Sequence, residues 1–324
     1  MNTGGTIWLE TCLAQLAPHL ANPDVTDIWI NKSGEVWLEL LGGTIERHDI
    51  AELTRPLLLR MARQIAALTA QGINREHPIL SGALPTGERV QVVIPPATRG
   101  EVAIAIRKHV SAGMALDDYR KAGGFARMIV QAGNPQSQLP SRNADDSDPL
   151  DILRAAVKAR KNILISGGTS SGKTTFLNAL LREIPAHERL ILIEDTPELQ
   201  MTHANAVGLL SARSTLGEAD VTAEDLLIAS LRMRPDRIIL GEIRGNEAAT
   251  FLRAVNTGHP GSISTIHADS PERAIDQLAL LVLQTGVRMG WEDVVTYVRR
   301  SLGVVVQLER NAGGRGVTQV MEMA

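Results

Sequence analysis

The spacing of apolar and polar residues changes along the chain and predicts two parts of different architecture. In the first part, apolar residues recur at helical intervals in two segments and alternate with polar residues in shorter ones. The helical segments are 7–20 and 51–71. The strand segments are a hairpin over 25–40, which turns at 32–34, and the runs 90–96 and 102–109. Helices mixed with antiparallel strands predict an α+β domain over residues 1–110.

The composition then shifts, and a second pattern follows. Residues 132–149 are rich in Pro, Ser, Asn and Asp, which predicts a linker or long surface loop within a connecting segment over 111–149. Beyond it, short apolar strands alternate with helices. The predicted strands are 162–166, 189–194, 237–241 and 262–266, and the predicted helices are 150–160, 173–183, 222–233, 246–256 and 271–284. This alternation predicts an α/β domain over 150–324, with a parallel sheet covered on both faces.

The composition narrows the classes of function. A chain of 324 residues is long enough for two domains with separate cores, and its 44% hydrophobic and 21% charged residues are typical of a soluble globular protein. The formal net charge of -3 gives no overall basic field, so we expect weak or no sequence-specific binding of nucleic acid. The single cysteine, Cys12, fits the core face of a helix and leaves no internal disulfide or tetracysteine zinc site.

No segment has the pattern of a membrane span or a secretion signal. The longest apolar run, around residues 278–283, is much shorter than the ~20 residues that cross a bilayer. The first ten residues lack a basic stretch followed by an apolar one, as a signal peptide would have. We therefore expect a cytoplasmic protein, and peripheral attachment to a membrane machine remains open.

A phosphate-binding motif, the P-loop G-x-x-x-x-G-K-[ST], opens the second domain between a buried strand and an apolar helix. The expected nucleotide-binding residues are Gly167, Gly168, Thr169, Ser170, Ser171, Gly172, Lys173, Thr174 and Thr175. The glycines let successive N–H groups face a phosphate, and the helix N-terminus adds partial positive charge. Lys173 would reach the β- and γ-phosphates, and the Thr174 hydroxyl would hold Mg²⁺.

Acidic residues at the ends of other strands would complete such a site. Glu194 and Asp195 end one predicted strand, Glu198 follows a proline turn, and Glu242 ends another strand. The carboxyl ends of parallel strands meet at the phosphate site, so these acids could orient Mg²⁺ or activate the attacking water. We expect Glu242 to be the general base, because its strand should adjoin the strand before the P-loop. Glu194 is the alternative base and a candidate Mg²⁺ ligand, and Glu198 is a further catalytic candidate.

ATP is the expected nucleotide, with hydrolysis to ADP and phosphate as the expected reaction. No N-K-x-D motif, which would read guanine, follows the P-loop; the segment 31–34 lacks the acid and precedes the loop. No second substrate pocket can be recognised, which argues against a kinase. Phosphoryl transfer to water needs a positioned water and neutralised charge rather than covalent chemistry.

Four motifs stand in order along the second domain. They are GGTSSGKTT (167–175), IEDTPEL (193–199), RMRPDRIILGEIRG (232–245) and TGHPGSISTIHADS (257–270). Together they resemble the hexameric secretion ATPases of bacteria, in which they would be the Walker A loop, the aspartate box, the Walker B strand and the histidine box. The residue sequences of the last two motifs are most similar to those of the type IV secretion and conjugative-transfer branch. A weaker similarity extends into the first domain through 84–96 and 104–109.

This resemblance implies a RecA-like second domain, a PAS-like first domain, nucleotide between the two, and a ring of six subunits. It also implies that arginines of the first domain close on the phosphates, with Arg89 and Arg107 as the candidates. A guanidinium fork suits a γ-phosphate, although each could instead be a surface arginine on an edge strand. Family members often carry a Walker B aspartate. Here Asp236 starts its strand, too far away to reach Mg²⁺.

The resemblance further implies a motor that powers pilus assembly or the translocation of DNA or protein. Such a motor would lie on the inner face of the bacterial inner membrane, in contact with other secretion-system components. Arg213 and three further arginines form a positive set, with two alternatives: a solvated basic face, or contacts to a neighbouring subunit's nucleotide or to the ring interior. The other three are Arg232, Arg234 and Arg237.

The histidine box places His259 and His267 at opposite ends of the predicted strand 262–266, so they cannot share one metal ion. We expect His267, at the carboxyl end, to sense the γ-phosphate or to position Glu242 and its water. A structural hydrogen bond is the alternative for His267. For His259 we expect a role in fixing a loop or in contacting another subunit.

Three rival functions are weighed against the secretion motor. Pilus-extending and secreting motors of the type II branch usually carry a tetracysteine zinc segment, which one cysteine cannot supply; retraction motors lack it too, so only motif wording separates them. A RecA-like DNA helicase is disfavoured by the net charge of -3 and the 3% aromatic content. A scaffold with a decayed P-loop conflicts with the presence of the lysine, the hydroxyl and the acids.

Overall fold

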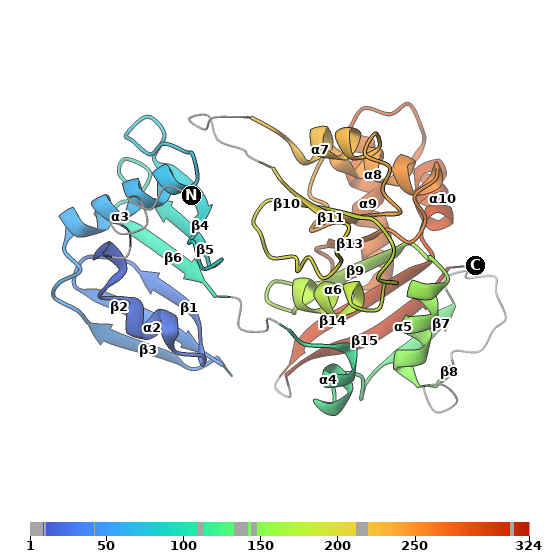
Figure 1. Cartoon of the computed structure of the whole chain (residues 1–324), viewed down its shortest axis with the longest axis horizontal. Coiled ribbons are helices and arrows are strands. Elements are labelled where there is room, and N and C mark those ends of the chain that lie inside the picture. The colour runs from blue at the N-terminus through green and yellow to red at the C-terminus, as the bar shows by residue number, and fades with distance from the viewer. Residues whose placement is uncertain are drawn as a thin grey trace. The chain divides into compact units, whose positions relative to one another are not determined.

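The computed structural model describes residues 9, 11–41, 43–108, 113–132, 142–143, 148–211, 220–311 and 314–323. It divides into two compact units, each with its own sheet (Figure 1). Among the described residues, the first unit contains those up to 108 together with 220 and 221, and the second contains those from 113 to 211 and from 222 onward. The expectation of an α+β part followed by an α/β part is confirmed in this sense.

In the described part of the first unit, six strands form an antiparallel sheet in the order β3-β2-β1-β6-β5-β4. The strands are β1 (Val25–Ile30), β2 (Glu35–Leu40), β3 (Ile45–Asp49), β4 (Ile79–Ala83), β5 (Arg89–Val93) and β6 (Ala103–Arg107), and the helices are α2 (Ala17–Ala21) and α3 (Arg55–Leu68). The predicted hairpin is β1–β2, and Cys12 lies in the core as expected. The helix expected over 7–20 is interrupted by a turn at 14–16, because Pro18 lacks the N–H that a helix interior requires and stands at the start of α2.

The second unit is built on a nine-stranded sheet, counted over the residues that the structure describes, in the order β11-β10-β12-β13-β9-β14-β15-β7-β8. The strands are β7 (Ile129–Ala132), β8 (Arg142–Asn143), β9 (Ile163–Gly167), β10 (Leu190–Glu194), β11 (Ala206–Leu210), β12 (Arg237–Leu240), β13 (Ile263–Ile266), β14 (Val304–Asn311) and β15 (Gly314–Glu322). From β11 to β14 every neighbouring pair is parallel, as expected. Beyond β14 the sheet is mixed, since β15 is antiparallel to β14 and β8 is antiparallel to β7.

Helices cover both faces of this sheet, as the sequence pattern predicts (Figure 1). The helices are α4 (Leu116–Lys121), α5 (Pro149–Lys158), α6 (Lys173–Leu181), α7 (Ala223–Ser230), α8 (Glu247–Asn256), α9 (Pro271–Gln284) and α10 (Trp291–Ser301). Successive residues of β9 point to opposite faces: Ile163 and Ile165 pack with Phe176 of α6, and Leu164 packs with Phe251 of α8. The strands are therefore buried on both sides, which explains their continuous apolar runs.

The connecting segment expected over 111–149 is partly incorporated into the second unit. Helix α4 and strand β7 come from its first half, and β7 pairs with β15. Leu116, Tyr119 and Met128 are buried in the same core as β9 and α6, which accounts for the difference. Most of the Pro- and Ser-rich stretch lies outside the described residues.

Within the described ranges, no helix is both long and apolar enough to cross a bilayer.

Candidate functional site

The P-loop connects β9 to α6 and has the geometry of a phosphate cradle. A Cβ on Gly167 would lie 2.5 Å from Ser171 Oγ and 2.7 Å from the Leu308 carbonyl oxygen, so only glycine fits there. Gly172 precedes α6 with φ +92°, a left-handed conformation that favours glycine, and Ser170 also has a positive φ of 57°. The loop therefore brings its backbone to the N-terminus of α6, where N–H groups point outward.

Lys173, the first residue of α6, folds back over this loop. Its side-chain Nζ donates to the carbonyl oxygens of Gly167 at 2.8 Å and Gly168 at 3.1 Å. Lys173 is only 8% exposed, and this burial lowers the pKa of the amine, an effect that the nearby Glu242 carboxylate opposes. Thr174 and Thr175 follow in the first turn of α6, beside the loop.

His267 lies between Lys173 and Glu242. Its Nδ1 is 3.3 Å from Lys173 Nζ, and its Nε2 is 2.8 Å from Glu242 Oε1, although out of line for a hydrogen bond. Because an ammonium group only donates, Nδ1 must accept, which places the imidazole proton on Nε2, toward the carboxylate. Burial lowers the pKa of His267, with Glu242 acting in the opposite direction and the charges of Lys173 and Arg244 adding to the decrease. The neutral imidazole thus joins the P-loop lysine to the Walker B acid.

The route by which Glu242 approaches the P-loop differs from our expectation. We expected its strand to adjoin the P-loop strand, but β13 lies between β12 and β9. That expectation was wrong because the order of parallel strands depends on long-range pairing, which the chain order does not give. Glu242 reaches Lys173 through His267, the residue that follows β13.

The backbone around Glu242 is fixed by β13. The Thr265 hydroxyl donates to the Gly241 carbonyl oxygen at 2.8 Å, and the Ile243 N–H donates to the Thr265 carbonyl oxygen at 2.9 Å. A Cβ on Gly241 would lie 3.2 Å from the Cβ of Glu194, so the missing side chain lets the ends of β10 and β12 approach closely. Thr265, a polar residue in the buried strand β13, thus fixes the backbone on both sides of Glu242.

The backbone beside His267 is fixed in the same way. The Ala268 carbonyl oxygen accepts from the Ser166 hydroxyl at 3.2 Å and from the Gln307 amide at 3.3 Å. Ser166 belongs to β9 and Gln307 to β14, and the two residues are paired in register. These donors tie the P-loop strand to the segment that carries His267. The one signal of these residues in the sequence is a polar residue within an otherwise apolar strand.

Glu194 and Glu198, two of the three acids of the aspartate box, differ in their partners. One carboxylate oxygen of Glu194 accepts from the backbone N–H groups of Glu198 at 2.7 Å and Leu199 at 2.8 Å, so this side chain shapes the turn after β10. The Glu198 carbonyl oxygen accepts from the Asn178 side chain at 3.0 Å, which joins the turn to α6. Glu194 and Glu198 therefore lie at the expected edge of the sheet, with Glu194 organising the local backbone.

A residue pair that sequence reasoning missed links the box to Glu242. Asp195 accepts from Arg244 Nη1 at 3.0 Å and from the Ser211 hydroxyl at 2.5 Å. The same guanidinium donates through Nε to Glu242 at 2.6 Å and contacts that carboxylate through Nη2 as well. The acids at the ends of β10 and β12 are thus bridged by one cation. The other candidate of this region, Arg213, lies outside the described residues.

Arg89 and Arg107, the candidates from the first unit, occupy directly paired positions on β5 and β6. Arg107 Nε donates to Asp27 on β1 at 3.0 Å, and its side chain is 44% exposed. Two arginines therefore stand side by side at one end of this sheet, with a carboxylate that balances part of their charge.

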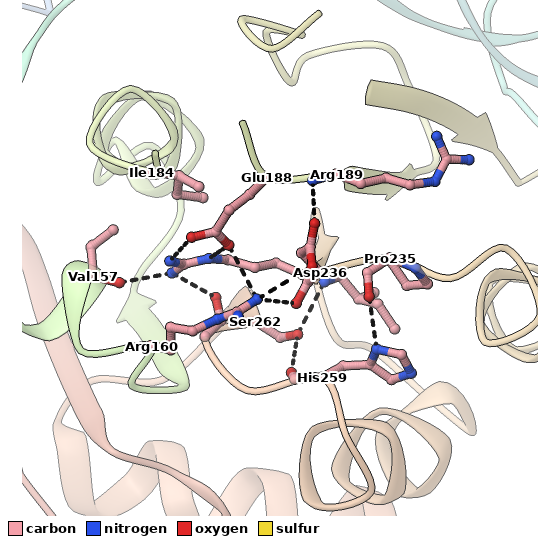
Figure 2. Close-up of polar contacts among 12 residues, drawn as sticks. Val157, Arg160, Ile184, Glu188, Arg189, Pro235, Asp236, His259 and Ser262 are labelled. Carbon is pink, nitrogen blue, oxygen red and sulfur yellow. Dashed lines mark hydrogen bonds and ion pairs between the residues drawn. The ribbon is translucent and has the colours of Figure 1, made fainter. Parts of the chain in front are cut away.

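Arg237 corrects our interpretation of the RMRPDR segment as a basic face. Its side chain is 0% exposed and donates to both oxygens of Glu188, through Nε at 2.7 Å and Nη2 at 2.8 Å. Arg237 is the first residue of β12, so it lies at the edge of the sheet opposite the P-loop. Figure 2 shows Glu188 and Arg160 side by side, and Arg160 Nη2 donates to Glu188 Oε2 at 3.2 Å. The buried guanidinium cannot reach a neighbouring subunit, because Glu188 and the carbonyl oxygens of Val157 and Gly261 occupy its donors. Arg232 and Arg234 of the same segment are exposed.

His259 lies on this opposite edge too, in the loop before β13. Its Nδ1 is 3.1 Å from the Pro235 carbonyl oxygen, and its own carbonyl oxygen accepts from the Ser262 hydroxyl at 2.9 Å (Figure 2). These contacts fit a role in fixing the loop. The two histidines of one motif are therefore separated by the length of β13, as their spacing predicts.

The chain is similar to known proteins along most of its length. Residues 11–315 match the family model described as "Type II/IV secretion system protein". The type IV secretion system protein VirB11 of Bartonella quintana is 35% identical over 96% of this chain and 91% of its own length. Among solved structures, the VirB11 ATPase from the Brucella suis type IV secretion system, in complex with sulphate, is similar with a TM-score of 0.51 and 34% identity over 97% of each chain.

The pilus retraction motor PilT with bound ADP has a TM-score of 0.61 over 98% of this chain and 83% of its own. At 20% identity this similarity shows the fold alone. The RecA-like P-loop fold expected for the second domain is confirmed by these neighbours. Because the family model covers both units and the relatives match along nearly the whole chain, the protein belongs to the type II/IV secretion system protein family.

Proposed function

We propose that this protein is the ATP-hydrolysing motor of a type IV secretion or conjugative transfer system. The observation that carries the proposal is the contact series Lys173–His267–Glu242, which joins the P-loop to an acid on another strand. A phosphate cradle with a lysine at its centre and a carboxylate nearby has the parts needed for phosphoryl transfer to water. The named relatives support the type IV secretion branch.

In this proposal the phosphates of ATP lie against the N–H groups of the loop and the start of α6. Lys173 leaves the carbonyl oxygens of Gly167 and Gly168 and binds the β- and γ-phosphates, as the charge of the nucleotide outweighs two neutral acceptors. Glu242 accepts a proton from the attacking water. His267, released from Lys173, turns its ring toward the γ-phosphate. Its contact with Glu242 therefore changes when a γ-phosphate is bound.

The residues at the loop also fit a magnesium ion. The Thr174 hydroxyl stands in the first turn of α6, and Mg²⁺ binds through one or two protein oxygens together with phosphates. Glu194 lies at the end of β10 and is the carboxylate that we assign to this ion, directly or through water. When bound, Mg²⁺ would neutralise charge on the β- and γ-phosphates.

The remaining parts of the proposal concern the assembly. Arg89 and Arg107 of the first unit close on the phosphates, and six subunits form a ring. The ring lies on the inner face of the bacterial inner membrane, with other secretion components as partners, and moves DNA or protein. The particle mass with an ATP analogue and Mg²⁺ tests the ring. A six-subunit mass supports it, and a stable monomer with and without nucleotide contradicts the motor.

Two substitutions test the assigned chemistry. Lys173→Ala is expected to abolish measurable turnover and to weaken ATP binding, because the phosphates lose their cation. Glu242→Gln is expected to lower kcat by about 10²–10⁴-fold while ATP binding is kept, since general base catalysis contributes that much. Turnover in a phosphate-release assay and binding of a fluorescent ATP analogue separate the two effects. Wild-type turnover in Glu242→Gln would reject Glu242 as the base.

A further inference from the structure

The turn that follows β12 is held firmly in place. The buried carboxylate of Glu247, at the start of α8, accepts from the backbone N–H groups of Arg244 at 2.6 Å and Gly245 at 2.8 Å. With the main chain fixed on this side and by Thr265 on the other, the direction of the Glu242 carboxylate depends on the side chains that bind it.

The Arg244 side chain contacts Glu242 and also reaches Asp195, which follows the neighbouring strand β10. Its Nε and Nη2 both contact Glu242 Oε2, and its Nη1 donates to Asp195 at the end of β10. The planar guanidinium fork presents these donors in one rigid geometry, so the two carboxylates are held at a fixed separation. Ser211, which follows β11, fixes the other oxygen of Asp195.

These contacts form one series across the carboxyl edge of the sheet. It runs from Ser211 through Asp195, Arg244 and Glu242 to His267, and its five members follow the ends of four neighbouring strands, β11, β10, β12 and β13. A lone exposed ion pair would contribute little. Arg244 instead bridges two acids, and it fixes the orientation of the carboxylate of Glu242, the largely buried one.

We propose that Arg244 is a positioning residue for ATP hydrolysis: it aims the Glu242 carboxylate and couples it to Asp195 of the aspartate box. This inference rests on the proposed role of Glu242 as the base. Arg244 acts through Glu242, and Asp195 acts through Arg244. Because a misplacement of about 1 Å can cost 10²-fold in rate, loss of the bridge reduces the chemical step far more than nucleotide binding.

The test is a double-mutant cycle in the full-length assembled protein, with Arg244→Gln, Asp195→Asn and the double variant. Arg244→Gln is expected to lower kcat about 10–100-fold, with the dissociation constant of an ATP analogue within about threefold of wild type. Asp195→Asn, which leaves Arg244 on Glu242, is expected to lower kcat about 3–10-fold by the same reasoning. The double variant should be no slower than Arg244→Gln, because residues acting in series are not additive.

Arg273→Gln is the matched control. Arg273, the third residue of α9, forms an exposed ion pair with Asp269 at 3.2 Å, and this pair touches none of the series. Its kcat is expected to equal that of wild type. Particle mass is measured for every variant, so that a loss of assembly is not mistaken for a loss of positioning.

Three results would overturn the proposal. A kcat within twofold of wild type in Arg244→Gln would show that Glu242 needs no bridge. Weaker ATP binding with unchanged kcat would make Arg244 a nucleotide ligand. Losses that multiply in the double variant would make Arg244 and Asp195 independent. The assignment of Glu242 as the base is tested separately. If Glu242→Gln retains turnover, Glu242 is not the base. If Glu242→Gln is inactive but the effects of Arg244→Gln and Asp195→Asn are independent, only the positioning role of Arg244 is rejected.

Discussion

His267 is the residue at which the P-loop and the Walker B acid meet. Its two ring nitrogens face groups of opposite character, the Lys173 amine and the Glu242 carboxylate. The neutral ring with its proton on Nε2 suits both neighbours at once. Protonation of Nδ1 would set two positive charges against each other, which is one reason why the pKa of His267 is lowered.

The titration of His267 can be predicted with its sign. The NMR signal of its ring, assigned by loss in His267→Asn, should titrate below pH 6.5 in the nucleotide-free protein. Lys173→Met should raise this pKa, because a repelling charge is removed, and Glu242→Gln should lower it. Since the unfolded chain takes up the proton first, this residue disfavours the folded state as the pH falls below about 6.5. Shifts of the opposite sign would contradict the contact series.

At the scale of elements, the Arg237–Glu188 pair joins the ends of several segments away from the P-loop. Arg237 starts β12, Glu188 precedes β10, and the carbonyl oxygens bonded to Arg237 belong to Val157 in α5 and Gly261 before β13. The pKa of Glu188 is lowered, first by the hydrogen bonds from Arg237. Its contribution to stability is therefore complete above pH 4.5 and is lost as the pH falls below that value.

Arg237→Met is expected to destabilise the second unit by up to about 3–5 kcal/mol, because the buried Glu188 carboxylate loses both hydrogen bonds from Arg237 and keeps only the contact from Arg160 at 3.2 Å. Hydrogen exchange of the β12 and β13 amides measures the loss. Arg237→Met with Glu188→Leu should recover much of it, since the buried charge is then absent. Arg232→Met is the control at an exposed arginine of the same segment and should change stability by less than about 0.5 kcal/mol. Unchanged exchange in Arg237→Met would contradict this role.

The elements that could be predicted from the sequence are those with local signals. Helix α9 has its predicted bounds, because Ser270 caps it and Pro271 begins it. Strands β14 and β15 and helix α10, which follow the last predicted element, were not anticipated. The Arg244–Asp195 contact could not be predicted either, because it depends on β10 lying beside β12, a pairing between segments far apart in sequence. The types of residue indicate which side chains can take part in the chemistry, but the sequence does not show which of them lie side by side in the fold.

At the scale of the whole molecule, each unit has a core of its own, and the comparisons extend over both. The P-loop series belongs entirely to the second unit. In the proposed function, the first unit takes part in catalysis through Arg89 and Arg107.

The ion pair between Arg107 and Asp27 allows a controlled test of that proposal. Arg107→Gln is expected to lower kcat at least about 10-fold if the guanidinium closes on the γ-phosphate, as charge-assisted contacts of this kind are strong. Asp27→Asn breaks the same pair from the other side and keeps the arginine, so its kcat should stay near wild type. Equal losses in both variants would instead assign Arg107 a structural role in the first unit. Phosphate release under saturating ATP is the measurement.

The series at the carboxyl edge has a consequence for electrical balance. Two cations, Lys173 and Arg244, stand beside two carboxylates, Asp195 and Glu242, while the imidazole between them is neutral. The charges of these five side chains balance one another, so together they offer no net positive charge to the several negative charges of a triphosphate. Under the proposed function, the further cations would be Mg²⁺ and the proposed Arg89 and Arg107.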